Sequence, residues 1–481
     1  MGPIRYRIDR ALGEGLEAKA KAHHRRRLNR IGWSHALDPS GSDIWAQGDP
    51  PPREGNAIEV LVDGADAFPK LIEEMRAAKS HIYYAGWMLT LSFQLTRGEQ
   101  PLVARDFLAE LAENVEVRVL LWGGAPLPGF HPNRSDVRDW ADELSNGTKV
   151  KVGLDTKERP LHCHHEKLVV IDDAVAFVGG LDMTTFGGDR YDTPDHPARG
   201  ALGWHDVSSC IRGPLVRDVA YHFAQRWRET TGEKLPEAPE QPPAGRHRGQ
   251  LIRTVPEKIY NSVPRGDFRI LECYIRAIRS ARKIIYLENQ FLWSPIIIDE
   301  LAKKLRTPPE DDFRLLIVLP AHPTTGDDDT RGQLAQLVEA DDDAGRVLAC
   351  ALYARAGAKA DAVYVHAKVG IIDDRWLTIG SANLNNHSLF NDSEVNIVTT
   401  DGDLAEQTRH RLWAEHLEVP LDRVSGDPTT VFDEMWKPIS EEQKERRDAG
   451  MPLTHRVSKL PHVSKRSKRL LGPLESLIVD G

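Results

Sequence analysis

Two segments far apart in the chain carry histidine, lysine and aspartate at the same spacing. The pattern is histidine, lysine two residues later and aspartate five residues after the lysine, and it occurs as His165, Lys167 and Asp172 and again as His366, Lys368 and Asp373. Mostly apolar residues separate each lysine from its aspartate, as in a buried strand. Side chains at positions i and i+2 of a strand point to the same side, so we expect each histidine to share a face with its lysine.

These residue types suit the cleavage of a phosphodiester. A phosphodiester carries one negative charge and gains more on its nonbridging oxygens during attack, so catalysis needs fixed cations, which Lys167 and Lys368 supply. A neutral imidazole can attack phosphorus, and a protonated one can give its proton to the leaving alcohol. We therefore predict that His165 and His366 flank one phosphorus atom.

Small residues follow each motif. A short strand is predicted after each, ending at Gly179 and Gly180 in the first half and at Gly380 in the second. Glycine at a strand end lets backbone and ligand approach closely. Ser381 and Asn383 come next, and their side chains can donate hydrogen bonds to phosphate oxygens.

One such motif alone is also typical of a surface strand with a hydrogen-bonded histidine. Two copies in equivalent places are hard to explain in that way, and they favour a catalytic pair. A zinc cluster from residues 162–165 and His205 is disfavoured, because neighbouring residues on a strand point to opposite faces. We expect no metal and no other cofactor. The acidic runs 327–329 and 341–343 are interpreted as solvated loops.

The elements that position the motifs are repeated. Each half has a helix, a buried strand, a second helix and a second buried strand, predicted at residues 71–78, 82–87, 107–113 and 117–122 and again at 271–278, 284–291, 297–305 and 315–319. Helices alternating with short apolar strands predict an α/β fold. We expect two similar lobes, each with a mixed sheet flanked by helices, related by a pseudo-two-fold axis around a shared cleft. A monomer can then complete the site.

Composition divides the chain further. The proline-rich run 236–243 cannot continue a helix or a central strand and marks the lobe boundary. We predict an N-terminal extension (1–55), a first lobe (56–235), a linker (236–250), a second lobe (251–425) and a basic C-terminal tail (426–481). The tail's cationic cluster is interpreted as a solvated helix face or frayed terminus, with a membrane-surface patch as the alternative; it comprises Lys465, Arg466, Lys468 and Arg469.

Composition also bears on the setting of the protein. Its 481 residues are 40% hydrophobic with a net charge of −9, close to the average for soluble globular proteins. No apolar run reaches the roughly 18 residues that cross a bilayer. The amino terminus lacks a secretory signal, and four separated cysteines fit a reducing compartment. We expect a cytoplasmic protein with peripheral membrane contact, and the acidic balance argues against a nucleic-acid partner.

Together, the paired motifs and the segment Gly380-Ser-x-Asn383 resemble the phospholipase D superfamily. Further segments are similar to the branch that acts on membrane lipids, namely residues 85–89, 179–184, 190–192, 204–207, 286–291 and 412–416. The resemblance implies a two-step reaction through a phosphohistidine. In that reaction His165 is the nucleophile, while His366 is the general acid and then the general base for the acceptor.

The resemblance also implies supporting residues. Asp206 is expected to orient His165, and Glu394 to orient His366, as carboxylates do for catalytic histidines in related enzymes. The motif aspartates Asp172 and Asp373 are expected to be mainly structural. One departure is Asp182, where many bacterial members carry asparagine, which puts a phosphate donor from that side in doubt.

The implied function is cleavage of the distal phosphodiester bond of a glycerophospholipid. Water as acceptor gives phosphatidic acid, and an alcohol gives a transphosphatidylation product. The alternatives are a cardiolipin synthase or related phosphatidyltransferase, a nuclease of the same superfamily, and a non-catalytic membrane-binding scaffold. Four tryptophans fit a substrate pocket and a packed core equally well in sequence, namely Trp87, Trp122, Trp204 and Trp293.

Overall fold

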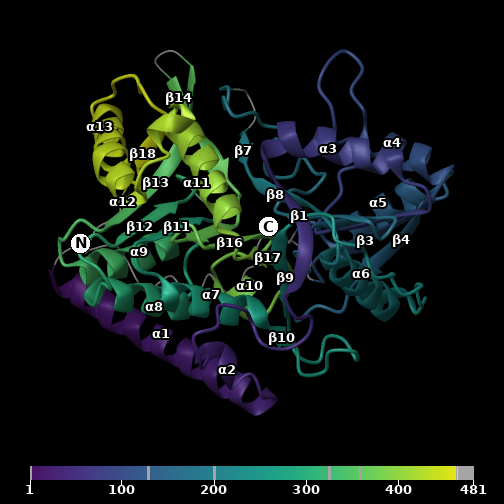
Figure 1. Ribbon diagram of the computed structural model, residues 1–481, viewed down its shortest axis with the longest axis horizontal. Coiled ribbons are helices and arrows are strands. Elements are labelled where there is room, and N and C mark those ends of the chain that lie inside the picture. The colour runs from purple at the N-terminus through teal and green to yellow at the C-terminus, as the bar shows by residue number, and fades with distance from the viewer. Residues whose placement is uncertain are drawn as a thin grey trace.

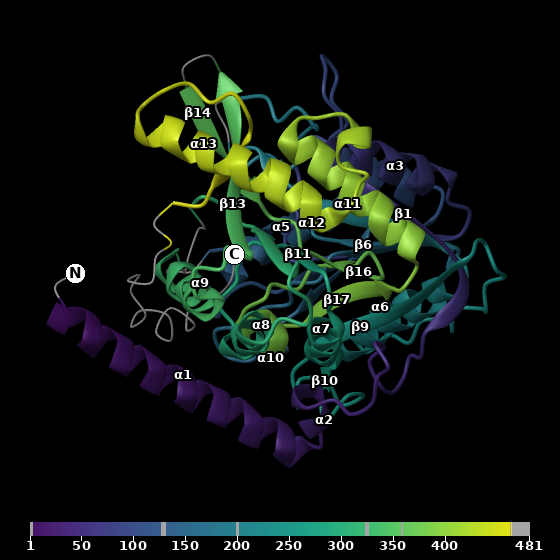
Figure 2. The same cartoon turned by 60° about the vertical axis from the view of Figure 1, so that its left-hand side comes forward.

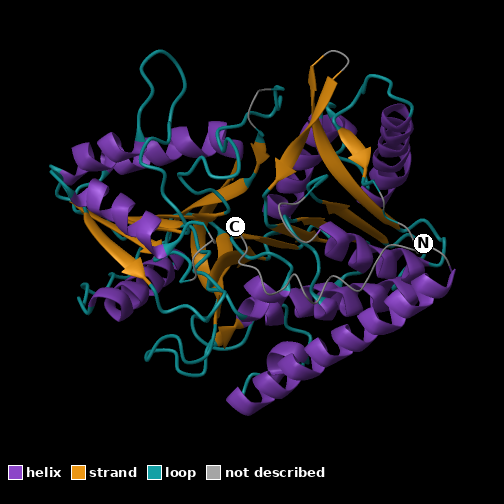
Figure 3. Ribbon diagram, turned by 180° about the vertical axis from the view of Figure 1, so that it is seen from behind, coloured by secondary structure: helices purple, strands orange, loops and turns teal. Residues whose placement is uncertain are grey.

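The protein folds into two lobes of the same construction. The computed structural model describes residues 3–126, 131–198, 202–322, 327–356, 359–461 and 463. The first lobe, coloured blue to teal, lies on one side of Figure 1, and the second, coloured green to yellow, lies on the other. Each lobe has a mixed sheet with helices outside it, as the view from behind also shows (Figure 3). The predicted α/β fold and the internal repeat are confirmed.

The first sheet has the strand order β4–β3–β2–β5–β6–β8–β1. Its strands are β1 (Arg53–Val62), β2 (His81–Gly86), β3 (Glu116–Trp122), β4 (Lys151–Asp155), β5 (Leu168–Ile171), β6 (Val175–Gly179) and β8 (Val207–Arg212). Neighbours among β2, β3 and β4 are parallel, and the other pairs are antiparallel. The helices of this lobe are α3 (Asp63–Ala77), α4 (Ala104–Ala112), α5 (Arg134–Ser145) and α6 (Leu215–Thr231).

The second sheet repeats this order as β13–β12–β11–β15–β16–β17–β9. Its strands are β9 (His247–Val255), β11 (Ile284–Glu288), β12 (Arg314–Val318), β13 (Val347–Ala356), β15 (Val369–Ile372), β16 (Trp376–Gly380) and β17 (Glu394–Thr399). The helices are α7 (Arg269–Ser280), α8 (Pro295–Arg306), α9 (Asp327–Asp341), α10 (Asn386–Phe390) and α11 (Gly402–Leu417). Short strands β10 (Asp267–Phe268) and β14 (Lys359–Val365) pair with β9 and β13.

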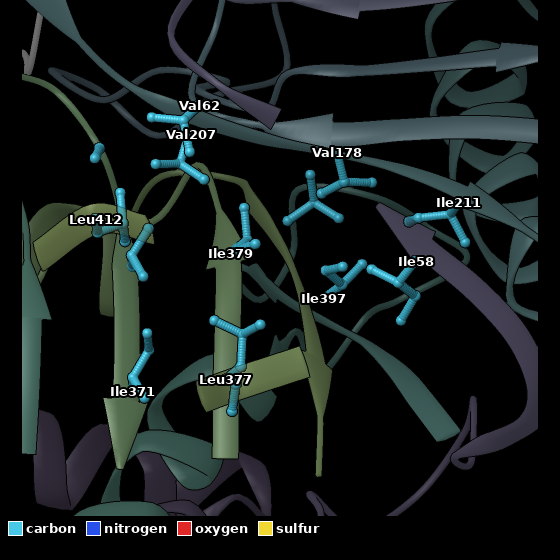
Figure 4. Close-up of a cluster of buried hydrophobic side chains, with 14 of the residues drawn as sticks. Ile58, Val62, Val178, Val207, Ile211, Ile371, Leu377, Ile379, Ile397 and Leu412 are labelled. Carbon is cyan, nitrogen blue, oxygen red and sulfur yellow. The ribbon is translucent and has the colours of Figure 1, made fainter. Parts of the chain in front are cut away.

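The lobes are joined by strand pairing and by a shared core. β1 of the first lobe pairs antiparallel with β9 of the second. Apolar side chains from both sheets then pack together between them, among them Ile58, Val178, Ile379 and Ile397 (Figure 4). Burying apolar side chains of this size stabilises by roughly 1.5 to 3 kcal/mol each, so the docked arrangement of the lobes is strongly favoured.

The described residues outside the predicted lobes also form helices and a strand. Helix α1 (Pro3–Ile31) runs along the outside of the second lobe (Figure 2), where Arg27 forms a buried ion pair of 2.6 Å with Glu257. It is followed by α2 (Ser34–Leu37). Toward the C-terminus lie a 3-10 turn (Leu421–Arg423), α12 (Pro428–Val431), a π-helical turn (Phe432–Trp436), α13 (Lys437–Asp448) and β18 (Val457–Lys459), which pairs with β13.

These elements refine the predicted segments. β9 begins at His247, inside the predicted linker 236–250, and β18 extends the second sheet from the predicted tail. The cationic cluster predicted at residues 465–469 lies outside the described residues. Among the described residues, none of the helices combines the length and the apolar character that crossing a bilayer requires.

The interpretation of the acidic runs as solvated loops was wrong in part. Residues 327–329 open helix α9. Asp341 ends this helix with its side chain buried, and it accepts backbone hydrogen bonds from Gly345 and Arg346. A carboxylate that caps its own turn in this way is structural, and it does not act as a free charge at the cleft.

Candidate active site

Both motif histidines lie where the two lobes meet. β5 begins at Leu168 and β15 at Val369, so each histidine and lysine occupy the extended segment directly before a central strand. His165 is 4% exposed and His366 is 5% exposed, and their ring centroids are 6.2 Å apart. The two imidazoles therefore face one shared cleft, as the sequence predicts.

Backbone hydrogen bonds hold each motif against the opposite lobe. The amide of His165 donates to the carbonyl of Ser393 at 3.0 Å, and the amide of His366 donates to the carbonyl of His205 at 2.8 Å. Strand β7 (Trp204–His205) of the first lobe runs parallel to β14, pairing His205 with Val365. His165 therefore lies beside the residue that precedes β17, and His366 lies beside the segment that leads into β8.

The two orienting carboxylates are exchanged relative to the prediction. His366 Nδ1 lies 2.6 Å from Asp206 Oδ2, and His165 Nδ1 lies 3.1 Å from Glu394 Oε1. The predicted pairing of Asp206 with His165 and of Glu394 with His366 was wrong. The reason is the contact between lobes, since Asp206 follows His205 and Glu394 follows Ser393, the residues that bind the opposite motif.

Burial and nearby charges set the protonation of the site. Burial, with Lys167 and Lys368 adding to it, lowers the pKa of His165 well below its usual range. Burial and the charge of Lys368 do the same to the pKa of His366. Burial raises the pKa of Glu394 to about 8. The empty cleft therefore favours neutral imidazoles, and a bound anion, by offsetting the lysine charges, favours an imidazolium.

Lys167 lines the cavity, and Lys368 contacts two residues that line it, Gln290 and His366. Lys167 Nζ lies 3.4 Å from Asp182 Oδ2 and donates to the carbonyl of His165. Lys368 Nζ donates to Gln290 Oε1 at 3.1 Å and to the carbonyl of His366. Asp182 thus holds the ammonium group of Lys167 at the cleft. This contact accounts for a carboxylate at the position where an asparagine side chain would bind phosphate directly.

Three polar residues that line the cleft were not considered in the sequence analysis as members of the site. Arg190, Gln290 and Tyr364 line the cavity together with both histidines. The guanidinium of Arg190 lies 3.4 Å above the ring of Trp204 and is 3% exposed, so it adds a third cation to the cleft. Arg190 and Gln290 fall within the segments that resemble the membrane-lipid branch, and that resemblance was the signal that could have found them.

Ser381 and Asn383, predicted as phosphate donors, do not line this cavity among the described residues. Ser381 Oγ donates to Glu394 Oε2 at 2.5 Å and accepts from the amide of Val395. Asn383 Nδ2 donates to Gln290 Oε1 at 3.3 Å. Both side chains position other cleft residues in this structure, and their role as phosphate donors stays a prediction.

The motif aspartates and glycines build the frame around the site. Asp172 accepts three backbone hydrogen bonds from residues 79–81, and Asp373 accepts three from residues 282–284. Both carboxylates thus fix the starts of β2 and β11. A Cβ atom added at Gly180 would lie 2.1 Å from Asp206 Oδ1, and equivalent additions at Gly179 and Gly380 would meet Ser208 and Asn396. These glycines make room for protein groups, including the carboxylate that orients His366.

The tryptophans divide between the cavity and the core. Trp87 and Trp204 line the cavity, and Trp204 lies 4.3 Å from His366 between ring centroids. Trp122 stacks behind Trp87 and is 1% exposed, so it is core. Trp293 packs edge-on against His387. Both interpretations of the tryptophans thus apply, to different members.

The histidines at 162–165 do not converge on one centre. His162 faces Asp392 at 3.3 Å, His164 faces Asp155 at 3.1 Å, and His165 faces Glu394. His205 lies in another cluster, with Asp63 and Glu288. Residues 162–165 and His205 therefore do not converge on one ion, as the zinc cluster that the sequence analysis disfavoured would require.

Comparison with known proteins gives matches on both lobes. A family model described as Phospholipase D matches residues 74–203, and one described as Cardiolipin synthase, PLD-like domain, matches residues 274–415. Phospholipase D A of Dictyostelium discoideum is 25% identical over 78% of this chain and 37% of its own length. Phospholipase D1 of Schizosaccharomyces pombe is 26% identical over 81% of this chain and 38% of its own length.

The match with another relative covers a larger share of that protein. Phospholipase D zeta 2 of Arabidopsis thaliana is 23% identical over 81% of this chain and 56% of its own length. The chain thus spans from about a third to little more than half of these relatives. A solved structure, phosphatidylserine synthase of Haemophilus influenzae Rd KW20, superposes with a TM-score of 0.48 at 15% identity and covers 74% of this chain and 85% of that one.

Proposed function

The chain belongs to the phospholipase D superfamily, and from this premise we propose that it is a phosphodiesterase that cleaves the distal phosphodiester bond of glycerophospholipids. The observation that carries the proposal is the pair of opposed imidazoles, 6.2 Å apart between centroids, with a lysine beside each. The Nδ1 atom of each ring is engaged by a carboxylate, which leaves each Nε2 for the substrate.

In the first step, Nε2 of neutral His165 attacks phosphorus and a P–N bond forms. The bond from phosphorus to the leaving alcohol breaks, and protonated His366 gives its proton to that oxygen. Charge developing on the nonbridging oxygens is stabilised by Lys167, Lys368 and Arg190. The carboxylate of Asp206, at 2.6 Å, stabilises the imidazolium of His366 before the proton leaves.

In the second step, His366 accepts a proton from the incoming hydroxyl. The hydroxyl oxygen attacks phosphorus, the P–N bond breaks, and neutral His165 is restored. Water yields phosphatidic acid, and an alcohol yields a new phosphatidyl ester. The same residues therefore serve hydrolysis and transfer, and a phosphatidyltransferase is the second candidate because the family model on the second lobe carries the name of cardiolipin synthase.

Contact with a bilayer is proposed at the rim of the cavity. Phe186 lines the cavity and is 38% exposed, and Leu202 is equally exposed. The backbone joins the segments that carry Phe186 and Leu202, because the carbonyl of Leu202 accepts a hydrogen bond from the amide of Asp189, three residues after Phe186. Exposed apolar groups beside the cavity suit a peripheral contact that brings a headgroup to the cleft.

The test uses phosphatidylcholine vesicles with water alone and with a primary alcohol, and single- and double-stranded DNA in parallel. Wild type is compared with His165→Ala, His366→Ala and His131→Ala, a control whose side chain is 64% exposed. Lipid turnover lost in both cleft variants and kept in the control is expected. Cleavage of DNA alone would assign a nuclease, and turnover of neither substrate would leave a non-catalytic scaffold.

A further inference from the structure

A second cluster of polar side chains lies buried between the lobes, outside the catalytic cavity. We propose that it binds one zinc-class divalent transition-metal ion through four ligands, namely Asp63, His196, His205 and Glu415. Asp63 is the first residue of α3, His205 is in β7, His196 is in the segment between β6 and β7, and Glu415 is in α11 of the second lobe. An ion here would link the lobes.

The spacing of the ligand atoms fits a tetrahedron. Zinc–nitrogen and zinc–oxygen distances of about 2.0 to 2.2 Å place neighbouring ligand atoms about 3.3 to 3.6 Å apart. His205 Nδ1 lies 3.0 Å from Asp63 Oδ1 and 3.5 Å from Glu415 Oε1. His196 Nε2 lies 3.1 Å from Glu415 Oε1 and 3.6 Å from Asp63 Oδ2. Each histidine thus contacts both carboxylates, in one contact at the separation that a shared ion requires and in the other about 0.2 to 0.3 Å below it.

Hydrogen bonding accounts for one of these four contacts, that of His196 Nε2 with Glu415 Oε1, and not for the contacts of His205 Nδ1 or Asp63 Oδ2. The side chains of Asp63, His196 and His205 are 0% exposed, and that of Glu415 is 5% exposed. Within the described part of the chain, Asp63 Oδ2 and His205 Nδ1 have no hydrogen-bond partner. A buried polar atom without a partner destabilises the folded state, because it has lost its hydrogen bonds to water. A metal ion between them removes this destabilisation for both atoms.

The outer nitrogens of both histidines meet further carboxylates. His205 Nε2 lies 2.8 Å from Glu288 Oε2, and His196 Nδ1 lies 3.0 Å from Asp192 Oδ2. Histidines that bind metal through one nitrogen almost always use the other on a carboxylate, carbonyl or water, which fixes the ring and raises its basicity. Glu288 is itself held by His416 at 2.8 Å. The cluster has both the ligands and the supporting contacts of a metal site.

The donor set selects the class of ion. Two imidazoles and two carboxylates suit zinc and its transition-metal neighbours, whereas calcium and magnesium prefer six or more oxygen ligands. Four protein ligands leave no open position, so we infer a structural ion. His205 precedes Asp206, and His196 lies in the segment that carries Arg190, so the ion would fix two parts of the catalytic cleft. The inference does not depend on which reaction the cleft performs.

Metal analysis of the untagged full-length protein tests the site. We expect close to one zinc per chain by elemental mass spectrometry, and a tetrahedral cobalt(II) absorption band after exchange. Glu415→Gln and His196→Gln should each lower zinc affinity by at least about tenfold, by comparison with the effect of losing a supporting contact. The matched control is Glu406→Gln, on the same helix with a side chain that is 48% exposed, and it should keep the metal.

Several results would overturn the inference. A folded protein that is isolated without metal, and whose Tm and cobalt spectrum do not respond to added ions, has an ion-pair network and no metal site. Stoichiometric metal that survives both Glu415→Gln and His196→Gln lies elsewhere. Stoichiometric calcium in place of zinc would refute the assigned class. Circular dichroism of each variant shows that it is folded, so lost metal is not confused with lost structure.

Discussion

Replacing Asp206 by asparagine is expected to separate the two chemical steps of the proposed reaction. Asp206 orients His366, the proposed acid and base, and does not contact His165, the proposed nucleophile. The lost interaction is a fully buried contact of 2.6 Å to a group that becomes charged. Such bonds contribute about 1.5 to 3 kcal/mol, which at 1.36 kcal/mol per decade is a loss of roughly 10- to 150-fold in rate.

The assay uses a phosphatidyl ester of p-nitrophenol, an alcohol acidic enough to leave without a proton. In a rapid-mixing experiment the first turnover releases p-nitrophenol as a burst, and later turnovers report the attack of water. Asp206→Asn should keep the burst rate within about threefold and slow the steady state by the 10- to 150-fold derived above. Glu394→Gln should slow the burst itself, because Glu394 supports the attacking imidazole.

The outcome distinguishes the observed pairing from the predicted one. A burst lost in Asp206→Asn and kept in Glu394→Gln would refute the assigned roles, since it would make His366 the nucleophile or pair the carboxylates the other way. Asp173→Asn is the matched control, because Asp173 is paired with His81 away from the cleft. Its burst and steady state should both equal those of wild type.

Three further changes test the frame of the site. Lys368→Met should lower kcat by about 10²- to 10³-fold, as expected for one lost donor to a developing oxyanion, measured on phosphatidylcholine at saturating substrate. Gly180→Ala places a methyl group against Asp206 and should lower stability by about 1 to 3 kcal/mol in chemical unfolding, whereas Gly426→Ala, with open space around it, should not. Burial raises the pKa of Glu394 to about 8, so its contribution to stability is present below its unfolded pKa and is lost as pH rises toward 8. The Tm should therefore fall between pH 5 and pH 8, and Glu394→Gln should reduce that fall; an equal fall in the variant would contradict the assignment.

The parts of the structure that the sequence predicts are those set by local patterns. The apolar strand at 82–87 and its counterpart at 284–291 were recognisable because burial on both faces leaves a short continuous apolar run. The spacing of His165 and Lys167 is a local pattern of the same kind, although the pair lies just before the strand and not within it. Periodicity and spacing act over a few residues, and one sequence displays them directly.

The parts that the sequence did not predict depend on how the lobes dock. His366 and Asp206 are 160 positions apart, and no local pattern indicates which carboxylate faces which imidazole. The direction of the Ser381 hydroxyl could not be predicted for the same reason, because it depends on where Glu394 lies. Arg190 reaches the cleft through an irregular segment, where neither a helical nor a strand period constrains the side chain.

The exchange of carboxylates between lobes has a consequence for how activity depends on the fold. If each lobe supplied a histidine together with its own carboxylate, a slight opening of the lobes would separate the imidazoles but leave each one oriented. With Asp206 on His366 and Glu394 on His165, the same opening removes both the opposite imidazole and the group that fixes its tautomer. Loss of orientation and loss of proximity then occur together. The proposed catalysis therefore requires the docked state, which the apolar core between the sheets and the pairing of β1 with β9 maintain.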